Sequence, residues 1–339
     1  GASDTYRKEQ AIMPDGTRTQ AYSAASPYGA ASNGTVQRTL KSSISCSGTG
    51  LHSGSPIAMT LRPAAPDTGV VFRRTDLQGA GAIIPARWDR VEDTKLCTRL
   101  GNGAGVSVGT VEHLMAALAG LGVDNAEIEL NGPEVPVMDG SAGPFVFLIE
   151  CAGIEAQAAP RRAIRITRRV EVDNGDRSAV LEPAESGFTA SFAFCFQGRQ
   201  GLGRQEQATA LDPAAFKGEI MRARTFGFLE DARQLQEMGL ARGASLHNAV
   251  VIDQGRILNE GGLRWRDEFV RHKILDVLGD LALAGTPLVG RFHGVNSGHF
   301  LNNALLAAVF ADPANWEWVG DAPAWNRAPE EPALAVASA

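Results

Sequence analysis

Apolar and polar residues alternate between residues 42 and 72, and glycines and prolines interrupt the alternation at short intervals. A period of two is typical of strands that bury one face, and Gly and Pro mark the turns between such strands. We therefore expect the folded region to begin with short strands joined by turns.

The period changes to that of a helix after residue 110. The apolar residues of this segment recur at helical spacing, at Val111, Leu114, Met115 and Leu118. Thr110 is the expected N-cap, and glycines end the pattern near residue 121. Alternation then returns, so we expect a strand at 126–132 followed by a second helix at 143–154.

A proline and a charge cluster at 157–166 separate this succession from a second, similar one. A new alternating pattern follows, and its Asn174-Gly175 pair is a strong hairpin signal. The order of elements then repeats, with a helix at 269–281, a strand at 288–293 and a helix at 299–310. We therefore expect two domains, at 42–158 and 162–314.

Three segments stand apart from the repeated pattern, one at each end of the chain and one inserted within the second domain. Residues 1–41 are rich in Ser, Thr, Ala and Gly without any period, which predicts a disordered arm, and 315–339 is expected to be a flexible tail. Residues 226–262 are an insertion without a counterpart in the first half. Its apolar residues either line a passage or pack a small subdomain, and their spacing alone favours packing.

Composition excludes several classes of protein. The chain of 339 residues is 44% hydrophobic, which suffices for two cores. Its net charge of -6 lacks the basic excess of nucleic-acid-binding proteins, so we expect no nucleic-acid partner. The apolar runs are shorter than the roughly 18 residues of a membrane-spanning helix, which leaves at most peripheral membrane contact. Four cysteines without zinc-ribbon or disulfide spacing indicate a reducing, cytoplasmic location, and we expect a monomer.

His272 and Asp276 lie four residues apart in the helix expected at 269–281. They therefore share one helix face and could bind a single metal ion, and Asp280 follows one turn later. A solvated or salt-bridged face is the alternative. Catalytic zinc commonly has three protein ligands and leaves its fourth position to water. We take His113, in the first apolar helix, as the third ligand.

Two further residues would complete a hydrolytic site. Glu112 precedes His113 and could act as general base on a metal-activated water. His299, if paired with Asp280, would be held protonated and could donate to a leaving amine. The structural alternatives are that His113 is a buried histidine bonded to a backbone carbonyl, and that Glu112 is a carboxylate that stabilises the start of a helix. His52 lies in a glycine-rich turn, where it either lines the site or belongs to a surface loop.

Four stretches carry a resemblance to a known family: TVEHLMAALAGLGVDNAEIELNGPEVPVMDGSAGPF, ARTFGF, LNEGGLRWRDEFVRHKILDVLGDLALAG and SGHFLNN. They closely resemble the corresponding stretches of the UDP-3-O-acyl-N-acetylglucosamine deacetylases, the zinc enzymes of lipid A synthesis. The resemblance runs from about residue 43 to 312. It implies an α+β fold of two similar domains, each layering helices against a β-sheet, with the active site at the domain interface.

The resemblance also implies a role for each site residue. The family's Zn²⁺ ligands correspond to His113, His272 and Asp276. Its general base corresponds to Glu112, and its proton donor to His299 oriented by Asp280. The residues beside the substrate carbonyl oxygen correspond to Lys273 and Thr225, and we assign substrate contacts to Phe226 and His52. The implied reaction hydrolyses the N-acetyl group of UDP-3-O-acyl-N-acetylglucosamine to a free amine and acetate.

The chain departs from the family's pattern at two places. Asn296 stands where we expect a lysine that contacts the nucleotide diphosphate. The insertion, which the family implies to be a hydrophobic passage for the acyl chain, differs at its outer residues Ala241, Arg242 and Leu246.

Two other functions remain open at this point. One is a related zinc amidohydrolase that acts on another acylated sugar nucleotide, and the other is a metal-stabilised sugar-nucleotide-binding protein without turnover. The presence of both Glu112 and His299 favours an enzyme, because binding alone requires neither.

Overall fold

The computed structural model describes residues 11–12, 18–19, 36–196 and 203–320. Strands β1 (Ala11–Ile12) and β2 (Arg18–Thr19) pair antiparallel within a small unit of their own. The described residues from 36 onward form one compact unit.

A five-stranded sheet forms the outer layer of the first half. Its order is β4 (Ile44–Thr49), β5 (Pro56–Pro63), β11 (Ala126–Leu130), β6 (Val70–Arg74) and β7 (Ile83–Pro85). The smaller pairings of this half involve β3 (Val36–Leu40), β8 (Val91–Asp93), β9 (Arg99–Gly101), β10 (Ser107–Val108) and β12 (Ile154–Pro160). The expected strands at the start of the fold and at 126–132 are therefore present.

A seven-stranded sheet forms the outer layer of the second half. Its strands are β13 (Ala163–Ile166), β14 (Val170–Asn174), β15 (Arg177–Glu182), β16 (Phe188–Cys195), β17 (Arg204–Ala210), β21 (Leu288–Val295) and β22 (Trp316–Val319). Strand β21 is central, because it pairs with β13, β15 and β16. The predicted hairpin joins β14 to β15, with Asn174 paired to Arg177.

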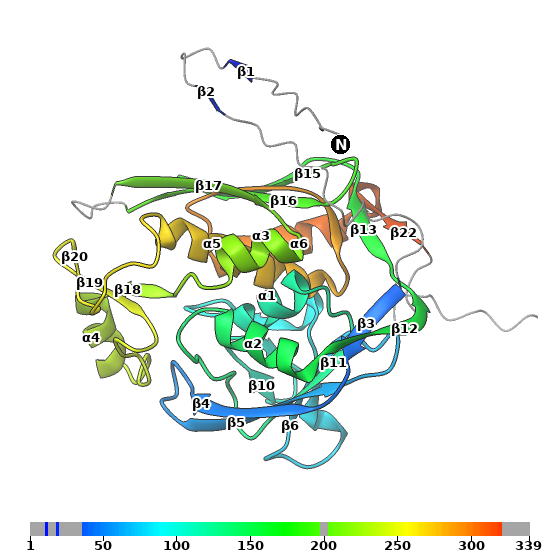
Figure 1. The fold of residues 1–339 in the computed structure, drawn as a ribbon, viewed down its shortest axis with the longest axis horizontal. Helices are drawn as coiled ribbons and strands as arrows, with labels where there is room; N and C mark the ends of the chain where they lie inside the picture. The colour runs from blue at the N-terminus through cyan, green and yellow to red at the C-terminus, as the bar shows by residue number, and fades with distance from the viewer. Residues whose placement is uncertain (1–10, 13–17, 20–35, 197–202, 321–339) are drawn as a thin grey trace, which may run out of the picture. The chain divides into compact units, whose positions relative to one another are not determined.

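The main helices lie between the two sheets (Figure 1). They are α1 (Glu112–Gly120), α2 (Gly143–Ala152), α5 (Glu268–Leu281) and α6 (His299–Ala311), and a short α3 (Pro213–Ala215) lies near α5. Helix α1 is rich in Ala and Leu, α5 is rich in Leu, Val and Ile, and nearly all of their side chains are buried. One continuous hydrophobic cluster includes Leu114 of α1, Leu278 of α5 and Val309 of α6. The architecture is α+β, with each half layering helices against its own sheet.

The expected limits of the arm and the tail are wrong. Residues 36–40, placed in the arm, form β3, because this strand pairs antiparallel with β12. Residues 316–319, placed in the tail, form β22, because this strand pairs antiparallel with β13. The remainder of both segments, apart from β1, β2, Lys41, Asn315 and Gly320, lies outside the described residues.

The expected N-cap of the first helix is also wrong. Val111 is the residue that precedes α1, and no side chain caps the helix there. Thr110 has a φ of 57° and donates its hydroxyl hydrogen to Glu134 Oε1 (3.0 Å). The hydroxyl therefore stabilises the turn before α1 instead of capping the helix.

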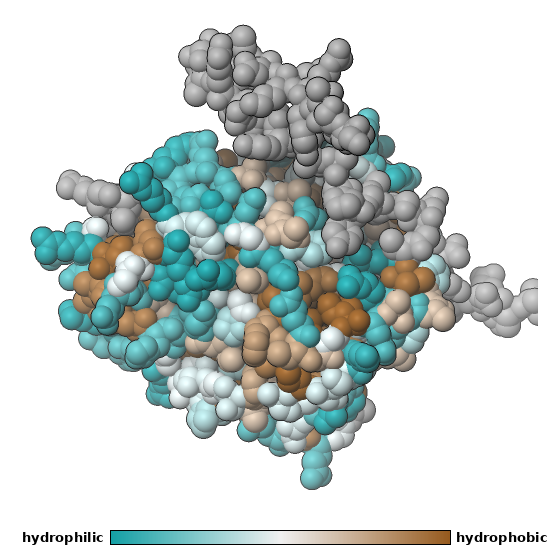
Figure 2. Space-filling model, in the orientation of Figure 1, coloured by the Kyte–Doolittle hydropathy of each residue, from teal (hydrophilic) through white to brown (hydrophobic). Residues whose placement is uncertain are grey.

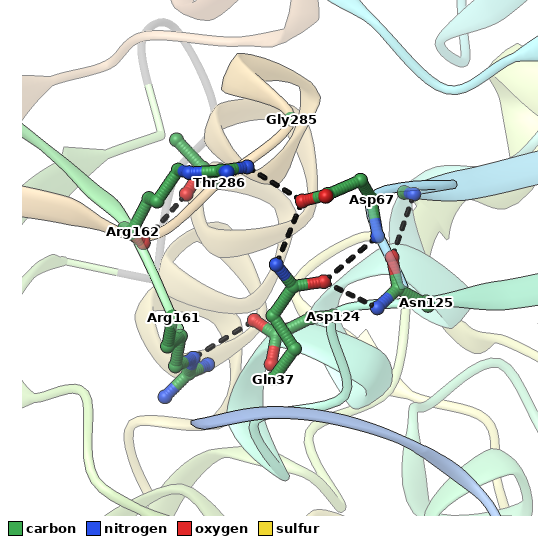
Figure 3. Close-up of a pocket in the computed structure, with 9 residues that line it drawn as sticks. Gln37, Asp67, Asp124, Asn125, Arg161, Arg162, Gly285 and Thr286 are labelled. Carbon is green, nitrogen blue, oxygen red and sulfur yellow. Dashed lines mark hydrogen bonds and ion pairs between the residues drawn. The ribbon is translucent and has the colours of Figure 1, made fainter. Parts of the chain in front are cut away.

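The strand pairing changes halves between β12 and β13. β12 pairs with β3, whereas β13 pairs with β21 and β22. Polar contacts anchor the link between the two strands to the first half (Figure 3), since Arg161 pairs with Asp124 (2.8 Å) and Arg162 with Asp67 (2.5 Å). Domain limits at 42–158 and 162–314 stay a prediction.

The insertion at 226–262 forms a small subdomain. It contains β18 (Phe226–Phe228), α4 (Leu229–Glu237), β19 (Val250–Asp253) and β20 (Arg256–Ile257), and its three strands form one sheet. The base of the subdomain packs in a cluster of four buried residues, Phe196, Val250, Ile252 and Phe269. Other apolar residues remain exposed, at Met238, Leu246 and Leu258. Figure 2 shows hydrophobic surface over this part of the molecule.

Among the described residues, no helix is both long enough and apolar enough to span a membrane.

Candidate metal centre and active site

Helices α1 and α5 bring three potential metal ligands together. His113 comes from the first turn of α1, and His272 and Asp276 come from consecutive turns of α5. One ligand atom of each lies within 4.8 Å of those of the other two. Asp276 Oδ1 is 3.4 Å from His113 Nε2 and 3.3 Å from His272 Nε2. The two halves of the chain thus contribute to one site, as the sequence indicates.

A glycine allows the two helices to approach this closely. A Cβ atom at Gly279 of α5 would lie 1.9 Å from the carbonyl oxygen of Glu112. Real Cβ atoms do not approach backbone oxygens to this distance, so a side chain at 279 would push α1 away from α5. Gly279 therefore sets the separation of His113 from the two ligands on α5.

His272 and Asp276 present free acceptor atoms to each other. His272 Nδ1 lies 2.9 Å from the carbonyl oxygen of Ala223, which can only accept a hydrogen bond. The proton therefore resides on Nδ1, and Nε2 keeps its lone pair for a metal. Asp276 Oδ1 is buried and has no hydrogen-bond partner among the described residues. A buried acceptor without a partner is costly, and a cation at this point would satisfy it.

The electrostatics of Asp276 also favour a cation. Burial alone would raise the pKa of this carboxyl, but His272 and His113 outweigh burial and hold the pKa well below its usual range. Asp276 is therefore a carboxylate at neutral pH. Two imidazoles and one carboxylate form a donor set that suits zinc and leaves a coordination position for water.

Glu112 and His299 lie together at the side of this centre. Glu112 is 3% exposed, and its Oε1 is 3.5 Å from His299 Nε2. Burial raises the pKa of Glu112 to about 7, although the charge of His299 opposes this shift. A carboxyl group with a pKa near the working pH is suited to accept a proton and release it again.

His299 is held by a fully buried carboxylate. Its Nδ1 donates to Asp280 Oδ2 (2.8 Å), and Asn302 Nδ2 donates to the same oxygen (2.9 Å). Burial opposes a charge on His299, but the carboxylates of Asp280 and Glu112 outweigh burial and raise its pKa to about 10. His299 is therefore an imidazolium at neutral pH, with Nε2 directed toward Glu112.

Lys273 lies on a different side of α5 from its neighbour His272. It lines a cavity of about 260 Å³ together with Phe194, Arg177 and Asn296. Its Nζ is 5.9 Å from the centre of the Phe194 ring, a distance at which a cation is attracted to an aromatic face. The cavity thus combines two cations with aromatic surface.

Thr225 directly precedes β18, and Phe226 is the first residue of this strand. The backbone N–H of Thr225 donates to the carbonyl of Gly140 (2.8 Å), which ties this segment to the first half. The ring centre of Phe226 is 6.1 Å from that of His272 and 4.8 Å from that of Phe269. Phe226 is therefore part of the wall between the candidate metal centre and the insertion.

His52 lies in the turn that joins β4 to β5. Its backbone N–H donates to Glu134 Oε1 (2.9 Å), and both ring nitrogens are buried without a hydrogen-bond partner among the described residues. Burial lowers the pKa of His52, and the charge of His299 acts in the same direction. The ring is therefore close enough to His299 to interact with its charge, and it retains hydrogen-bonding capacity for a ligand.

Two further features of the site, a threonine and an ion pair, were not predicted from the sequence. Thr98 contacts both Glu112 and Asp280, through its backbone N–H (3.1 Å) and its hydroxyl (2.6 Å). Arg224 and the fully buried Glu268 form an ion pair (2.8 Å) that fixes the segment before Thr225 against α5. No sequence pattern marks a single threonine as part of a site. The charged residues of ARTFGF and RDEF, in contrast, could have suggested an ion pair.

Comparison with known proteins identifies relatives over most of the chain. The family model LpxC, UDP-3-O-acyl N-acetylglycosamine deacetylase, matches residues 37–311. The chain is 54% identical to the UDP-3-O-acyl-N-acetylglucosamine deacetylase of Acidithiobacillus ferrooxidans, over 84% of this chain and 92% of that protein. It is 50% identical to the enzyme of the same name from Xanthomonas axonopodis pv. citri, over 90% of this chain and 98% of that protein. The chain is also 52% identical to the enzyme of the same name from Haemophilus influenzae, over 84% of this chain and 92% of that protein. Since the family model covers well over half of the sequence, the chain belongs to the UDP-3-O-acyl N-acetylglycosamine deacetylase family.

Proposed function

We propose that this protein is a zinc-dependent amidohydrolase that removes the N-acetyl group of UDP-3-O-acyl-N-acetylglucosamine in lipid A biosynthesis, and that His113, His272 and Asp276 hold the metal. One observation supports this proposal above the others. The three ligand atoms converge on one point beside a carboxylate and an imidazolium. A site for binding alone would need no such acid–base pair.

Each residue of the pair has one step in the proposed reaction. Zn²⁺ at this position would polarise the amide carbonyl and lower the pKa of a water to about 7. Glu112, as a carboxylate, accepts a proton from the attacking water. His299, as an imidazolium, donates a proton from Nε2 to the departing nitrogen, which therefore leaves as an amine. Asp280 keeps the imidazole ring oriented throughout and favours its charged form until the proton is donated.

Lys273 and Thr225 are proposed to face the amide carbonyl oxygen. Charge develops on this oxygen as the carbonyl carbon becomes tetrahedral, and donors fixed in advance at that point stabilise the transition state. The ion pair between Arg224 and Glu268 supports this role, because it holds the backbone next to Thr225 in place.

The surroundings suggest where the other parts of the substrate bind. We propose that the aromatic and apolar residues of the insertion, beginning with Phe226, receive the acyl chain, and that His52 contacts the sugar. Arg177 and Lys273 line the same cavity as Asn296. Arg177, the cation of this cavity that is not assigned to the carbonyl oxygen, is proposed to contact the diphosphate in place of the lysine expected at 296. The four cysteines are all free, which fits a cytoplasmic enzyme.

The pH dependence of kcat/KM follows from the raised pKa values of Glu112 and His299. Glu112 must be deprotonated to accept a proton, so kcat/KM is expected to rise as it ionises, at about pH 7 or below, since a divalent cation beside it favours the carboxylate. His299 must be protonated to donate, so kcat/KM is expected to fall as pH rises through about 10. A pH–rate profile of the metal-loaded enzyme checks both limbs. A profile that stays flat through pH 10 would contradict the role of His299.

Removal of the metal tests the proposed cofactor. Dialysis against a chelator is expected to abolish turnover, and added Zn²⁺ is expected to restore it. Fe²⁺ and Mg²⁺ are added in parallel to compare how well other ions restore turnover. The hard cation Mg²⁺ should not restore it, because the site contains two imidazoles. Metal content is measured by mass spectrometry and the fold by circular dichroism. A metal-free protein that retains the parent rate would overturn the proposed cofactor.

A further inference from the structure

Thr98 contacts both sides of the acid–base pair, and it is fully buried just before β9. Its backbone N–H donates to Glu112 Oε2 (3.1 Å), and its hydroxyl donates to Asp280 Oδ1 (2.6 Å). We infer that Thr98 is a positioning residue of the deacetylase, which sets the general base and the carboxylate that orients the general acid relative to each other. This inference rests on the proposed function.

The hydrogen bonds to Asp280 are unevenly shared between its two oxygens. Oδ2 accepts from His299 Nδ1 and from Asn302 Nδ2, whereas Thr98 supplies the hydrogen bond to Oδ1. Without the hydroxyl, Oδ1 would be a buried charged oxygen without this donor, which is a costly state. The carboxylate would then turn to share the donors of Oδ2. His299 would lose its fixed orientation, because the ring is held through that oxygen.

The direction of the hydroxyl bond is determined by its two neighbours. A carboxylate only accepts and an amide NH₂ only donates. Thr98 Oγ1 therefore donates to Asp280 and accepts from Asn303 Nδ2 (3.2 Å), which also donates to the carbonyl of His299 (2.8 Å). Serine could replace threonine in both bonds. Valine has the same shape as threonine but can make neither.

The backbone of Thr98 is fixed independently of its side chain. Its carbonyl accepts from the N–H of Val111 (3.4 Å) at the start of α1, and its N–H holds Glu112. A side-chain substitution at 98 therefore leaves the hydrogen bond to the base in place. It removes only the support of Asp280, and through it that of His299.

The test compares three variants of the metal-loaded enzyme on UDP-3-O-acyl-N-acetylglucosamine. Thr98→Val is expected to lower kcat roughly 10- to 100-fold, the effect of one lost hydrogen bond to a charged group, with KM little changed. Thr98→Ser is expected to restore most of kcat. The matched control is Thr39→Val, because Thr39 is also buried and its hydroxyl donates to Asn125 O (2.7 Å) and accepts from Ala64 N (3.0 Å). This control is expected to keep the parent kcat while losing stability.

The inference would be overturned if Thr98→Val kept the parent kcat, matched Thr39→Val, or was not rescued by serine. If the valine variant does not fold, Thr98→Ala takes its place with the same expected loss and the same rescue. Glu112→Ala and His299→Gln are measured in the same assay. If they also keep the parent rate, the proposed function has failed; if they lose activity while the Thr98 variants do not, only the role of Thr98 has failed.

Discussion

Glu112→Ala is expected to lower kcat by roughly 10²- to 10⁴-fold, the contribution of one well-placed general base, while bound Zn²⁺ stays at the parent level. The carboxylate is not among the three ligand atoms that converge on the metal centre. Alanine is also a better helix former than glutamate in the first turn of α1. The variant should therefore fold and bind metal but fail to deprotonate water. Steady-state kinetics and metal analysis of the same preparation measure both effects.

Glu112→Gln is the matched variant for this prediction. Its amide oxygen can still accept the hydrogen bond from the Thr98 N–H (3.1 Å in the parent), so the shape of the site is preserved. An amide cannot accept a proton at neutral pH, and a similar loss of kcat is therefore expected. If either variant hydrolysed substrate at the parent rate, Glu112 would not be the base.

His113→Ala is expected to lose both metal and turnover. It removes one of three ligands, and the loss of metal affinity should exceed the roughly 100-fold effect of losing a residue that only supports a ligand. Asp276 Oδ1 would also lose one of the two imidazoles that face it. Metal content after extensive dialysis and kcat before and after added Zn²⁺ are the measurements.

His293→Ala is the control for this second prediction. His293 lies on β21 and contacts Ser191 (2.6 Å) on the exposed face of the sheet, and it is not part of the candidate metal centre. It should retain both metal and activity. A His113→Ala variant that keeps its metal and its rate as His293→Ala does would remove His113 from the ligand set.

Part of the candidate metal centre could be predicted from the sequence, because two of its residues lie close together along the chain. His272 and Asp276 share a face of α5 simply by their spacing, so a helical pattern was sufficient to pair them. His113 comes from α1, and its approach depends on Gly279, whose role only the crossing of the two helices reveals. Residue types alone made His113 a candidate, and tertiary structure brings it within reach.

Other features depend on packing that a pattern does not encode. Thr98 precedes a short strand, and nothing in its neighbourhood distinguishes it from other threonines. Lys273 follows His272 directly, yet Lys273 and not His272 lines the cavity beside Phe194, because consecutive helical residues point in different directions. The strand β22 was predicted as tail because prolines and alanines follow it, whereas its pairing with β13 depends on a partner about 150 residues away in sequence.

The insertion shows how local and tertiary signals can differ. Spacing alone favoured packing of its apolar residues, and its base does pack around Phe269 and Val250. Its outer surface nevertheless exposes Met238 and Leu246. An apolar surface that stays open to solvent on an inserted subdomain is typical of a binding surface for apolar ligands or partners.

The most direct test of the central claim is the product formed from a defined substrate. The zinc-loaded enzyme is incubated with UDP-3-O-acyl-N-acetylglucosamine, and with the same sugar nucleotide lacking the acyl chain, and the products are identified by mass spectrometry. We expect loss of a single acetyl group as acetate and a free 2-amino group on the acylated substrate, with little reaction of the other. Equal hydrolysis of both sugars, or no acetate from the acylated one, would contradict the account.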